Sequence, residues 1–341
     1  MTINEYNQQI KSSVITFLTT CLKQTILPEI SPTGKWGNDA VNRILTLTTQ
    51  GKMLRSTLLF LSHNLFSDDN HTDTLLKTAA ALELIQTGLV IHDDVMDQDE
   101  ERRGSDSVHI QYKKIFVAEG IDNPHKTGES FAICAGDMAY FFAFQLLSSI
   151  KPESLGQSLN SLFAKENALV CVGQMTDVYG GQTKKDFTEK EILSIYENKT
   201  ARYSTILPMI AGATIAAVNG QTLKHIQRIG TALGICFQIQ DDYLNLFGDP
   251  KITGKPVGSD IREGKQTLYR FLYQQKIGNF DIQNPENVIR QMKEFHILEE
   301  AETIKKEYRK TLDEELNHLP VRSDTKQLFL DLVGYIIERE K

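Results

Sequence analysis

The sequence has few cysteines and no unbroken run of about 18 apolar residues. Its cysteines Cys21, Cys134, Cys171 and Cys236 are far apart, with no CxxC pair and no histidine at zinc-ligand spacing. This pattern argues against a disulfide framework and a structural zinc, and it fits a reducing compartment. The N-terminus lacks a charged segment followed by an apolar one, and no stretch of about 18 apolar residues occurs. We therefore expect a cytoplasmic protein without a membrane span.

Glycine and proline are also scarce, with 22 and 9 among 341 residues, which excludes a collagen-like or low-complexity chain. A composition that is 40% hydrophobic and 24% charged is ordinary for a folded protein. The 37 basic residues are outnumbered by 44 acidic ones, which leaves a net charge of −7. This acidic balance argues against a general affinity for nucleic acid, because such binding needs a basic surface.

Convincing strand alternation is missing, and apolar residues instead recur three and four apart, as on one face of a helix. Leu75, Ala79, Leu82, Ile85 and Leu89 are an example. Other such segments lie at about 4–27, 40–66, 130–150, 156–180, 189–218, 221–247 and 286–316. Proline, glycine and polar residues predict loops at 28–37, 123–128 and 248–264. The pattern predicts an all-α bundle, and the length of 341 residues allows one large domain or two ordinary ones.

Three aspartates, Asp93, Asp94 and Asp97, end one of these apolar segments in the sequence LVIHDDVMDQDEERRG. On a helix Asp93 and Asp97 are four residues apart, so both carboxylates leave one face about 6 Å from each other along the axis. Like charges at this spacing destabilise a helix unless a cation lies between them, and oxygen ligands suit Mg²⁺ or Ca²⁺. For this cluster alone, a solvated acidic helix end is the alternative interpretation.

A second acidic cluster, Asp241 and Asp242 in FQIQDDYLNLFGD, ends another apolar segment, and Asn245 continues the same face. Two helices of this kind could direct their carboxylates toward one another across a bundle cavity, where Mg²⁺ would bridge them to a substrate phosphate. The two clusters together are much more specific than either one alone.

Basic residues lie near both clusters, as a diphosphate site requires, because metal ions alone leave terminal phosphate oxygens uncompensated. The planar guanidinium of arginine matches phosphate oxygens, and lysine supplies a point charge. Any one of these residues is more often a surface residue than part of a site. They are Lys52, Arg55, Arg102, Arg103, Lys199, Lys255 and Lys265.

At least six segments between residues 48 and 270 resemble, in order, the motifs of trans-isoprenyl diphosphate synthases. The two aspartate-rich motifs of that family are resembled by HDDVMDQDEERRG and FQIQDDYLNLFGD. A further motif, before the first of these, is resembled by GKMLR. The motifs between the two are resembled by CAGDMAY, GQMTD and NKTARYS. GKPVGSDIREGKQTL resembles the loop that closes over the diphosphates. The resemblance implies a single large helical bundle with a central apolar cavity. In it, 1–35 form an N-terminal helix and loop, 48–270 the motif-bearing core, and 271–341 the C-terminal helices.

The resemblance also implies an enzyme that condenses isopentenyl diphosphate with an allylic diphosphate, and it assigns residues to each part of the site. Three Mg²⁺ would be held by Asp93, Asp97 and Asp241, with Asp94, Asp242 and Asn245 in support. The allylic diphosphate would be bound by Arg102, Lys199, Lys255 and Lys265. Isopentenyl diphosphate would be bound by Lys52, Arg55, Gln86 and Arg103. The residues beside the reacting carbons would be Lys199, Thr200 and Gln238, whose polar groups can stabilise a carbocation.

Product length depends on what closes the path of the growing chain, which should run beside the helix before Asp93. Gly88 and Leu89 lie about one turn earlier and are not aromatic, so the opening should admit a chain beyond fifteen carbons. Phe141 and neighbouring aromatic residues are a candidate deeper floor. We therefore expect geranylgeranyl diphosphate, with a farnesyl or a longer polyprenyl product as alternatives. Asn245, where many relatives have a third aspartate, should tune metal affinity and leave activity intact.

Other functions are compatible with part of these features. A class I terpene cyclase shares the bundle and the first aspartate motif, but it needs no second diphosphate pocket. A metal-dependent phosphohydrolase would use the pair His92-Asp93, but it needs further histidines. A non-catalytic modulating subunit typically lacks the first aspartate motif, which this chain keeps. The family resemblance also implies a homodimer.

Overall fold

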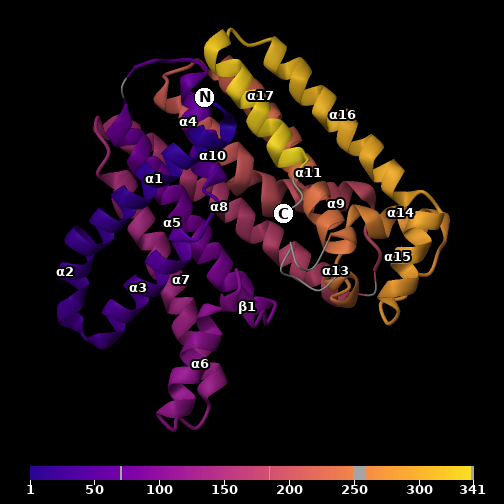
Figure 1. Cartoon of the computed structure of the whole chain (residues 1–341), viewed down its shortest axis with the longest axis horizontal. Helices are drawn as coiled ribbons and strands as arrows, with labels where there is room; N and C mark the ends of the chain where they lie inside the picture. Colours follow the sequence, from indigo (N-terminus) through magenta and orange to yellow (C-terminus); the bar gives the residue numbers. More distant parts are fainter. Residues whose placement is uncertain (70, 184, 249–257, 339–341) are drawn as a thin grey trace. The chain divides into compact units, whose positions relative to one another are not determined.

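The computed structural model describes residues 1–69, 71–183, 185–248 and 258–338, and there the chain is almost entirely helical (Figure 1). The strands found in this part of the chain are β1 (Glu101–Arg102) and β2 (Ser105–Asp106), which pair antiparallel. The predicted all-α class is confirmed. The chain divides into two compact units, with boundaries inside α4 and α8. The single domain 1–341 stays a prediction.

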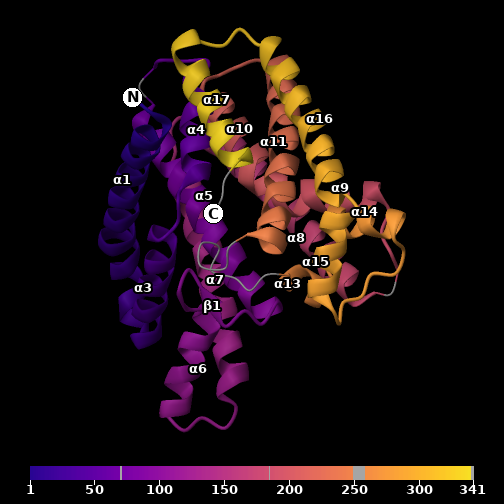
Figure 2. The same ribbon diagram turned by 45° about the vertical axis from the view of Figure 1, so that its right-hand side comes forward.

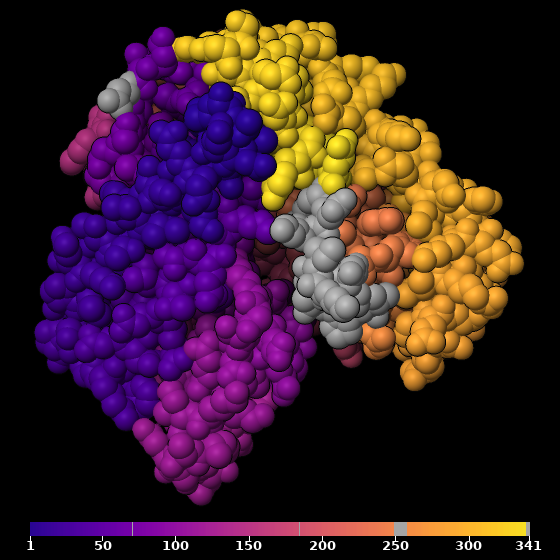
Figure 3. All heavy atoms as spheres, viewed as in Figure 1, coloured from indigo at the N-terminus to yellow at the C-terminus, as the bar shows by residue number. Residues whose placement is uncertain are grey.

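The first unit contains residues 1–60 and 69–161. Its helices are α1 (Ile3–Cys21), the π-helix η1 (Leu22–Ile26), α2 (Leu27–Ile30), the 3₁₀-helix η2 (Ser31–Thr33), α3 (Lys35–Thr49), the first part of α4 (Leu54–Asn64), α5 (Thr72–Met96), α6 (Val108–Ala118), α7 (Pro124–Ser148) and the start of α8 (Glu153–Gln182). In the space-filling view its N-terminal helices form a continuous surface, coloured indigo (Figure 3).

The second unit contains residues 61–68 and 162–341. Its elements after α8 are α9 (Glu189–Ile195), the π-helix η3 (Tyr196–Ile206), α10 (Leu207–Ile215), α11 (Gly220–Phe247), α13 (Ser259–Arg262), α14 (Leu268–Lys276), α15 (Pro285–Glu294), α16 (Ile297–Asn317) and α17 (Ser323–Ile337). Within this unit α11 packs against η3 and α16.

In the first unit α5 packs on α7, and α6 lies beside the start of α7 (Figure 2). The contact between α5 and α7 is close because Gly88 and Gly136 have no side chain there. A Cβ on Gly88 would lie 2.8 Å from the carbonyl oxygen of Gly136. An aromatic cluster of Trp36, Phe116 and Phe131 forms a second core region, with ring centroids 4.8 to 5.6 Å apart.

Three of the predicted segments differ from the structure. The segment 40–66 is two helices, because the chain breaks between α3 and α4, where Met53 has a positive φ of 56°. The segment 123–128 is not a loop but the beginning of α7. The side chain of Asn123 accepts a hydrogen bond from the amide of Lys126, and Pro124 occupies the first turn, where its missing N–H costs nothing. The 28–37 segment is likewise mostly helical, in α2, η2 and α3.

Candidate active site

The first aspartate motif ends α5. Asp97 caps this helix, and its amide donates to the carbonyl of Asp93 at 2.8 Å. Both residues are partly exposed. The C-terminal end of a helix carries partial negative charge, so carboxylates there are destabilised unless a cation binds them. The local structure therefore favours a cation at Asp93 and Asp97.

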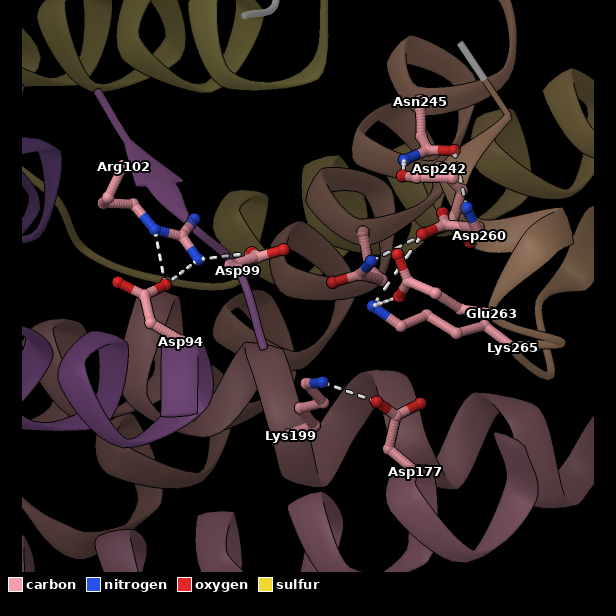
Figure 4. Close-up of polar contacts among 12 residues, drawn as sticks. Asp94, Asp99, Arg102, Asp177, Lys199, Asp242, Asn245, Asp260, Glu263 and Lys265 are labelled. Atoms are coloured by element: carbon pink, nitrogen blue, oxygen red, sulfur yellow. Dashed lines mark hydrogen bonds and ion pairs between the residues drawn. The ribbon is translucent and has the colours of Figure 1, made fainter. Parts of the chain in front are cut away.

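Asp94 has a different environment, because it is 1% exposed and bonded to Arg102 (Figure 4). The Nε of Arg102 donates to Oδ1 of Asp94 at 2.7 Å, and its Nη2 donates to Asp99 at 3.0 Å. Burial raises the pKa of the Asp94 carboxyl to about 6, although Arg102 opposes that rise. The second oxygen, Oδ2, has no hydrogen-bond partner. Asp94 thus anchors the strand β1, which carries Arg102, beside the motif.

The structure brings together parts of the predicted isopentenyl diphosphate pocket. The guanidinium of Arg103 lies against Gly51, where an added Cβ would be 3.6 Å from Nη1. The same Nη1 donates to the carbonyl of Leu47 at 2.6 Å. Arg103 also has a positive φ of 55°, a strained conformation that is concentrated at functional sites. The loop that contains Lys52 and the turn that follows β1 therefore meet.

Sequence reasoning missed Glu83, a buried residue of α5 in this region. Its Oε1 accepts hydrogen bonds from the amide of Ser56 at 3.2 Å and from its hydroxyl at 2.7 Å. Burial raises the pKa of Glu83, while the charges of Arg55 and Arg103 oppose that rise. The signal in the sequence was a single carboxylate within the apolar run ALELIQ, three residues before Gln86, which is half-buried.

The second aspartate motif ends α11 in the second unit. Asp241 is exposed and Asp242 is buried, so adjacent carboxylates have different environments. Burial raises the pKa of Asp242 well above its usual value. Asn245 is held by the next segment, because its Nδ2 donates to Ser259 Oγ at 2.6 Å and its Oδ1 accepts from the amide of Asp260 at 3.2 Å. Asn245 therefore joins α11 to α13.

The basic residues predicted for the allylic diphosphate in this unit are paired with carboxylates (Figure 4). The Nζ of Lys199 lies 2.5 Å from Asp177 Oδ2, and the Nζ of Lys265 lies 2.8 Å from Glu263. Lys265 is also 3.9 Å from Asp260. Lys255 lies outside the described residues. An incoming diphosphate would compete with these carboxylates for the two lysines.

Lys199 and Thr200 belong to the π-helix η3, a conformation found mostly at functional sites. The backbone of η3 lies close to α8, because a Cβ on Gly173 would overlap Lys199. The hydroxyl of Thr200 donates to Oε1 of Gln238 at 2.6 Å. The structure thus brings together Thr200 and Gln238, which the sequence assigned to the same role.

The predicted chain-length residues have unexpected environments. A Cβ on Gly88 would lie 2.5 Å from the ring of Tyr140, so Gly88 is a packing contact between α5 and α7. Leu89 is half-buried on the same helix. Phe141 is 71% exposed, so within this chain it points away from the interior and not toward a tunnel floor. The sequence could not distinguish these faces, because α7 has aromatic residues at several successive positions.

The donor set fits Mg²⁺, which the resemblance implies. Among the residues that the structure describes, no three Asp, Glu, His or Cys side chains gather as a ready-made metal cage. Mg²⁺ is usually bound by one or two carboxylates together with substrate phosphates. The carboxylates of Asp93 and Asp97, at the negative end of α5, are donors of that kind.

An all-α fold with an aspartate motif at the end of α5, and another at the end of α11, defines a class of helical enzymes that act on diphosphates. The polyprenyl synthetase family model matches residues 36–308, and the chain belongs to this family. The predicted resemblance to trans-isoprenyl diphosphate synthases is confirmed.

Individual relatives agree with this assignment. The geranylgeranyl diphosphate synthase of Saccharolobus solfataricus is 30% identical over 315 residues, which cover 86% of this chain and 88% of that protein. A short chain isoprenyl diphosphate synthase of Methanocaldococcus jannaschii is 38% identical over 218 residues, which are 64% of this chain but 61% of that protein. A crystal structure of a geranylgeranyl pyrophosphate synthase from Corynebacterium glutamicum, complexed with isoprenyl diphosphate and magnesium, superimposes with a TM-score of 0.87. It is 26% identical and covers 99% of this chain and 100% of that one.

Proposed function

We propose that the protein is a Mg²⁺-dependent trans-prenyltransferase that condenses isopentenyl diphosphate with an allylic diphosphate. The observation that carries this proposal is the ordered set of motifs, with two aspartate clusters at helix ends and basic residues beside each. Relatives named geranylgeranyl diphosphate synthase support the reaction class and a twenty-carbon product. Farnesyl diphosphate or a longer polyprenyl diphosphate is the alternative product.

The proposed reaction breaks the C1–O bond of the allylic substrate, and diphosphate leaves with the electron pair. The allylic carbon becomes electron-poor, and the π electrons of isopentenyl diphosphate form the new carbon–carbon bond to it. The resulting cation loses a proton, which the departing diphosphate accepts, and a new double bond forms. The products are an allylic diphosphate five carbons longer and inorganic diphosphate. No protein nucleophile is required.

The residues of this chain would bind, orient and protect the reactants. Asp93, Asp97 and Asp241 would hold Mg²⁺, which supplies positive charge to the leaving diphosphate. Lys199 and Lys265 would exchange their carboxylate partners for allylic phosphate oxygens, and Lys255 is proposed from the motif alone. Their present partners orient these lysines before substrate arrives.

Isopentenyl diphosphate would bind to Lys52, Arg55, Gln86 and Arg103. The proximity of Arg103 to Gly51 supports a pocket built from both motifs. Glu83 would keep the arginines of this pocket in place by offsetting their mutual repulsion. Burial lowers the pKa of Arg103, the charge of Glu83 opposes that shift, and the charge of Arg55 adds to it. Thr200 and Gln238 would face the developing carbocation with oxygen lone pairs, which stabilise positive charge without being displaced by it.

We further propose a homodimer in the cytoplasm. Apolar side chains are exposed along α8, where Val172, Met175 and Tyr179 are 54 to 71% exposed, and along α7, where Phe141 is exposed to the same degree. Large apolar faces of this kind are typical of subunit interfaces. By length and composition alone α5 and α7 could cross a membrane. The core helix of a folded protein passes the same test, and 72% of the α5 window and 44% of the α7 window are buried inside the protein.

The test is a product assay with isopentenyl diphosphate, Mg²⁺ and dimethylallyl, geranyl or farnesyl diphosphate, with chain length read by mass spectrometry. A dominant twenty-carbon diphosphate would support the proposal in full. Fifteen-carbon or much longer products would keep the reaction and change the assigned product. If isopentenyl diphosphate remained unconsumed with every primer, the proposed function would be wrong.

A further inference from the structure

Four residues of α11, each four positions after the last, form a stripe that faces η3. The first two, Gly230 and Gly234, allow the backbones to approach closely. A Cβ on Gly234 would lie 2.5 Å from Cα of Ala201 and 2.6 Å from Oγ1 of Thr205. The next two residues of the stripe are Gln238 and Asp242. Because the helices are so close, these two side chains reach directly across to η3.

The polar residues of the two helices form one continuous chain of hydrogen bonds. Thr200 Oγ1 donates to Gln238 Oε1 at 2.6 Å, and Gln238 Nε2 donates to Asp242 Oδ1 at 2.7 Å. The hydroxyl of Tyr196 donates to the other oxygen of Asp242, Oδ2. That hydroxyl also accepts from the backbone amide of Leu268 at 2.7 Å. Tyr196 and Thr200 are four residues apart on η3, matching the spacing of their partners on α11.

The direction of this chain determines how the amide of Gln238 is turned. Both oxygens of Asp242 accept hydrogen bonds, Oδ2 from the Tyr196 hydroxyl and Oδ1 from the NH₂ group of Gln238. The carbonyl oxygen of Gln238 must then face Thr200. If the amide were turned over, its oxygen would face the oxygens of Asp242. The Thr200 hydroxyl would then face an NH₂ group, which cannot accept its hydrogen bond. Asp242 can enforce this orientation because Tyr196, buried and 3% exposed, holds its second oxygen.

We propose that Tyr196 is a positioning residue for the condensation, which acts through Asp242 to fix the orientation of the Gln238 amide. The inference rests on the proposed function, in which Gln238 and Thr200 lie beside the carbocation. An amide oxygen stabilises positive charge, whereas an amide NH₂ repels it, so the orientation of this one group changes the barrier. None of the diphosphate contacts assigned above involves Tyr196, so substrate binding should not depend on it.

The test is Tyr196→Phe, which keeps the buried ring and removes the hydroxyl. We expect the single-turnover rate of condensation to fall about tenfold, while the KM values for both diphosphates and the Mg²⁺ concentration for half-maximal activity stay within about twofold. The matched control is Tyr273→Phe. Tyr273 is 2% exposed in the same apolar cluster, and its hydroxyl donates to Gln291, which does not belong to the hydrogen-bond chain from Thr200 to Tyr196. This variant should keep the full rate.

A second measurement distinguishes positioning from general support of the fold. In a Gln238→Ala background Tyr196 has no amide to orient, so adding Tyr196→Phe should cost no further rate. The same tenfold loss in both backgrounds would overturn the proposal, as would an unchanged rate in the single variant. If Tyr196→Phe does not fold, Asp242→Asn replaces it. Because Asp242 is also assigned to support the metal, its rate is measured at saturating Mg²⁺, and the loss should again disappear in the Gln238→Ala background. An inactive wild-type protein would instead refute the proposed function.

Discussion

The close approach of α11 and η3 predicts that Gly234 cannot be replaced by alanine without cost. The added methyl group would meet backbone atoms of η3, which can move only if the helix moves. A Cβ there would be 2.5 Å from Cα of Ala201, a backbone atom, so the two helices must separate. Inserting a methyl group into a packed core costs about 1–3 kcal/mol, and a backbone obstacle puts this site at the upper end. Alanine regains about 1 kcal/mol over glycine in a helix, so Gly234→Ala should lower the free energy of unfolding by about 2 kcal/mol.

The matched control is Gly334→Ala in α17, where an added Cβ meets no atom within 4 Å. With no steric cost, only the helical preference remains, so this variant should gain about 0.5–1 kcal/mol. Urea unfolding followed by circular dichroism measures both changes. Single-turnover kinetics of Gly234→Ala should also show a slower condensation, because separating the helices lengthens the hydrogen bond from the Thr200 hydroxyl to the Gln238 amide oxygen. The reasoning would be refuted if both variants shifted the urea midpoint upward.

Three further predictions concern other parts of the molecule. Glu83→Gln should raise the KM for isopentenyl diphosphate about tenfold, because Arg55 and Arg103 lose the charge that offsets their repulsion. The KM for the allylic substrate should stay unchanged. Steady-state kinetics with each substrate varied in turn measures both constants, and an equal rise in the two KM values would contradict the prediction. Asp93→Ala should lower kcat at least about a hundredfold, and EDTA should abolish turnover by the wild type, whereas turnover that survives EDTA would exclude the proposed metal role. Burial lowers the pKa of His109 from 6.5, so below pH 6.5 the unfolded chain binds a proton that the folded chain does not, and the free energy of unfolding should fall as the pH drops. Unfolding of His109→Gln should lack this part of the pH dependence, and identical pH profiles for the two proteins would contradict it.

The sequence predicted the fold class because long helices leave a periodic apolar pattern, and that pattern is local. It did not predict the break between α3 and α4, since the apolar spacing runs on across Gly51 and Met53. The positive φ of Met53 depends on the surrounding structure and leaves no mark in the pattern of apolar residues. The start of α7 was also missed, although Asn123 and Pro124 form an N-terminal cap and first turn that a search for capping residues could have recognised.

For the site, the sequence identified residue types and their order but not their environments. Asp93 and Asp94 are adjacent, yet one is partly exposed and the other is buried with Arg102. Asp241 and Asp242 differ in the same way. Which aspartate of a pair faces inward depends on the rotation of its helix against its neighbours, and that rotation is set by packing.

The sequence by itself therefore determined the helical class and the family, and it identified candidate residues for binding metal and diphosphate, because each of these depends on local periodicity or on short motifs. Only the tertiary structure decided which side chains contact one another. The hydrogen bonds from Thr200 through Gln238 and Asp242 to Tyr196 join positions up to 46 residues apart, and the exposure of Phe141 depends on which face of α7 packs on α5. Contacts of this kind arise from the close packing of helices distant in sequence, which no local pattern encodes.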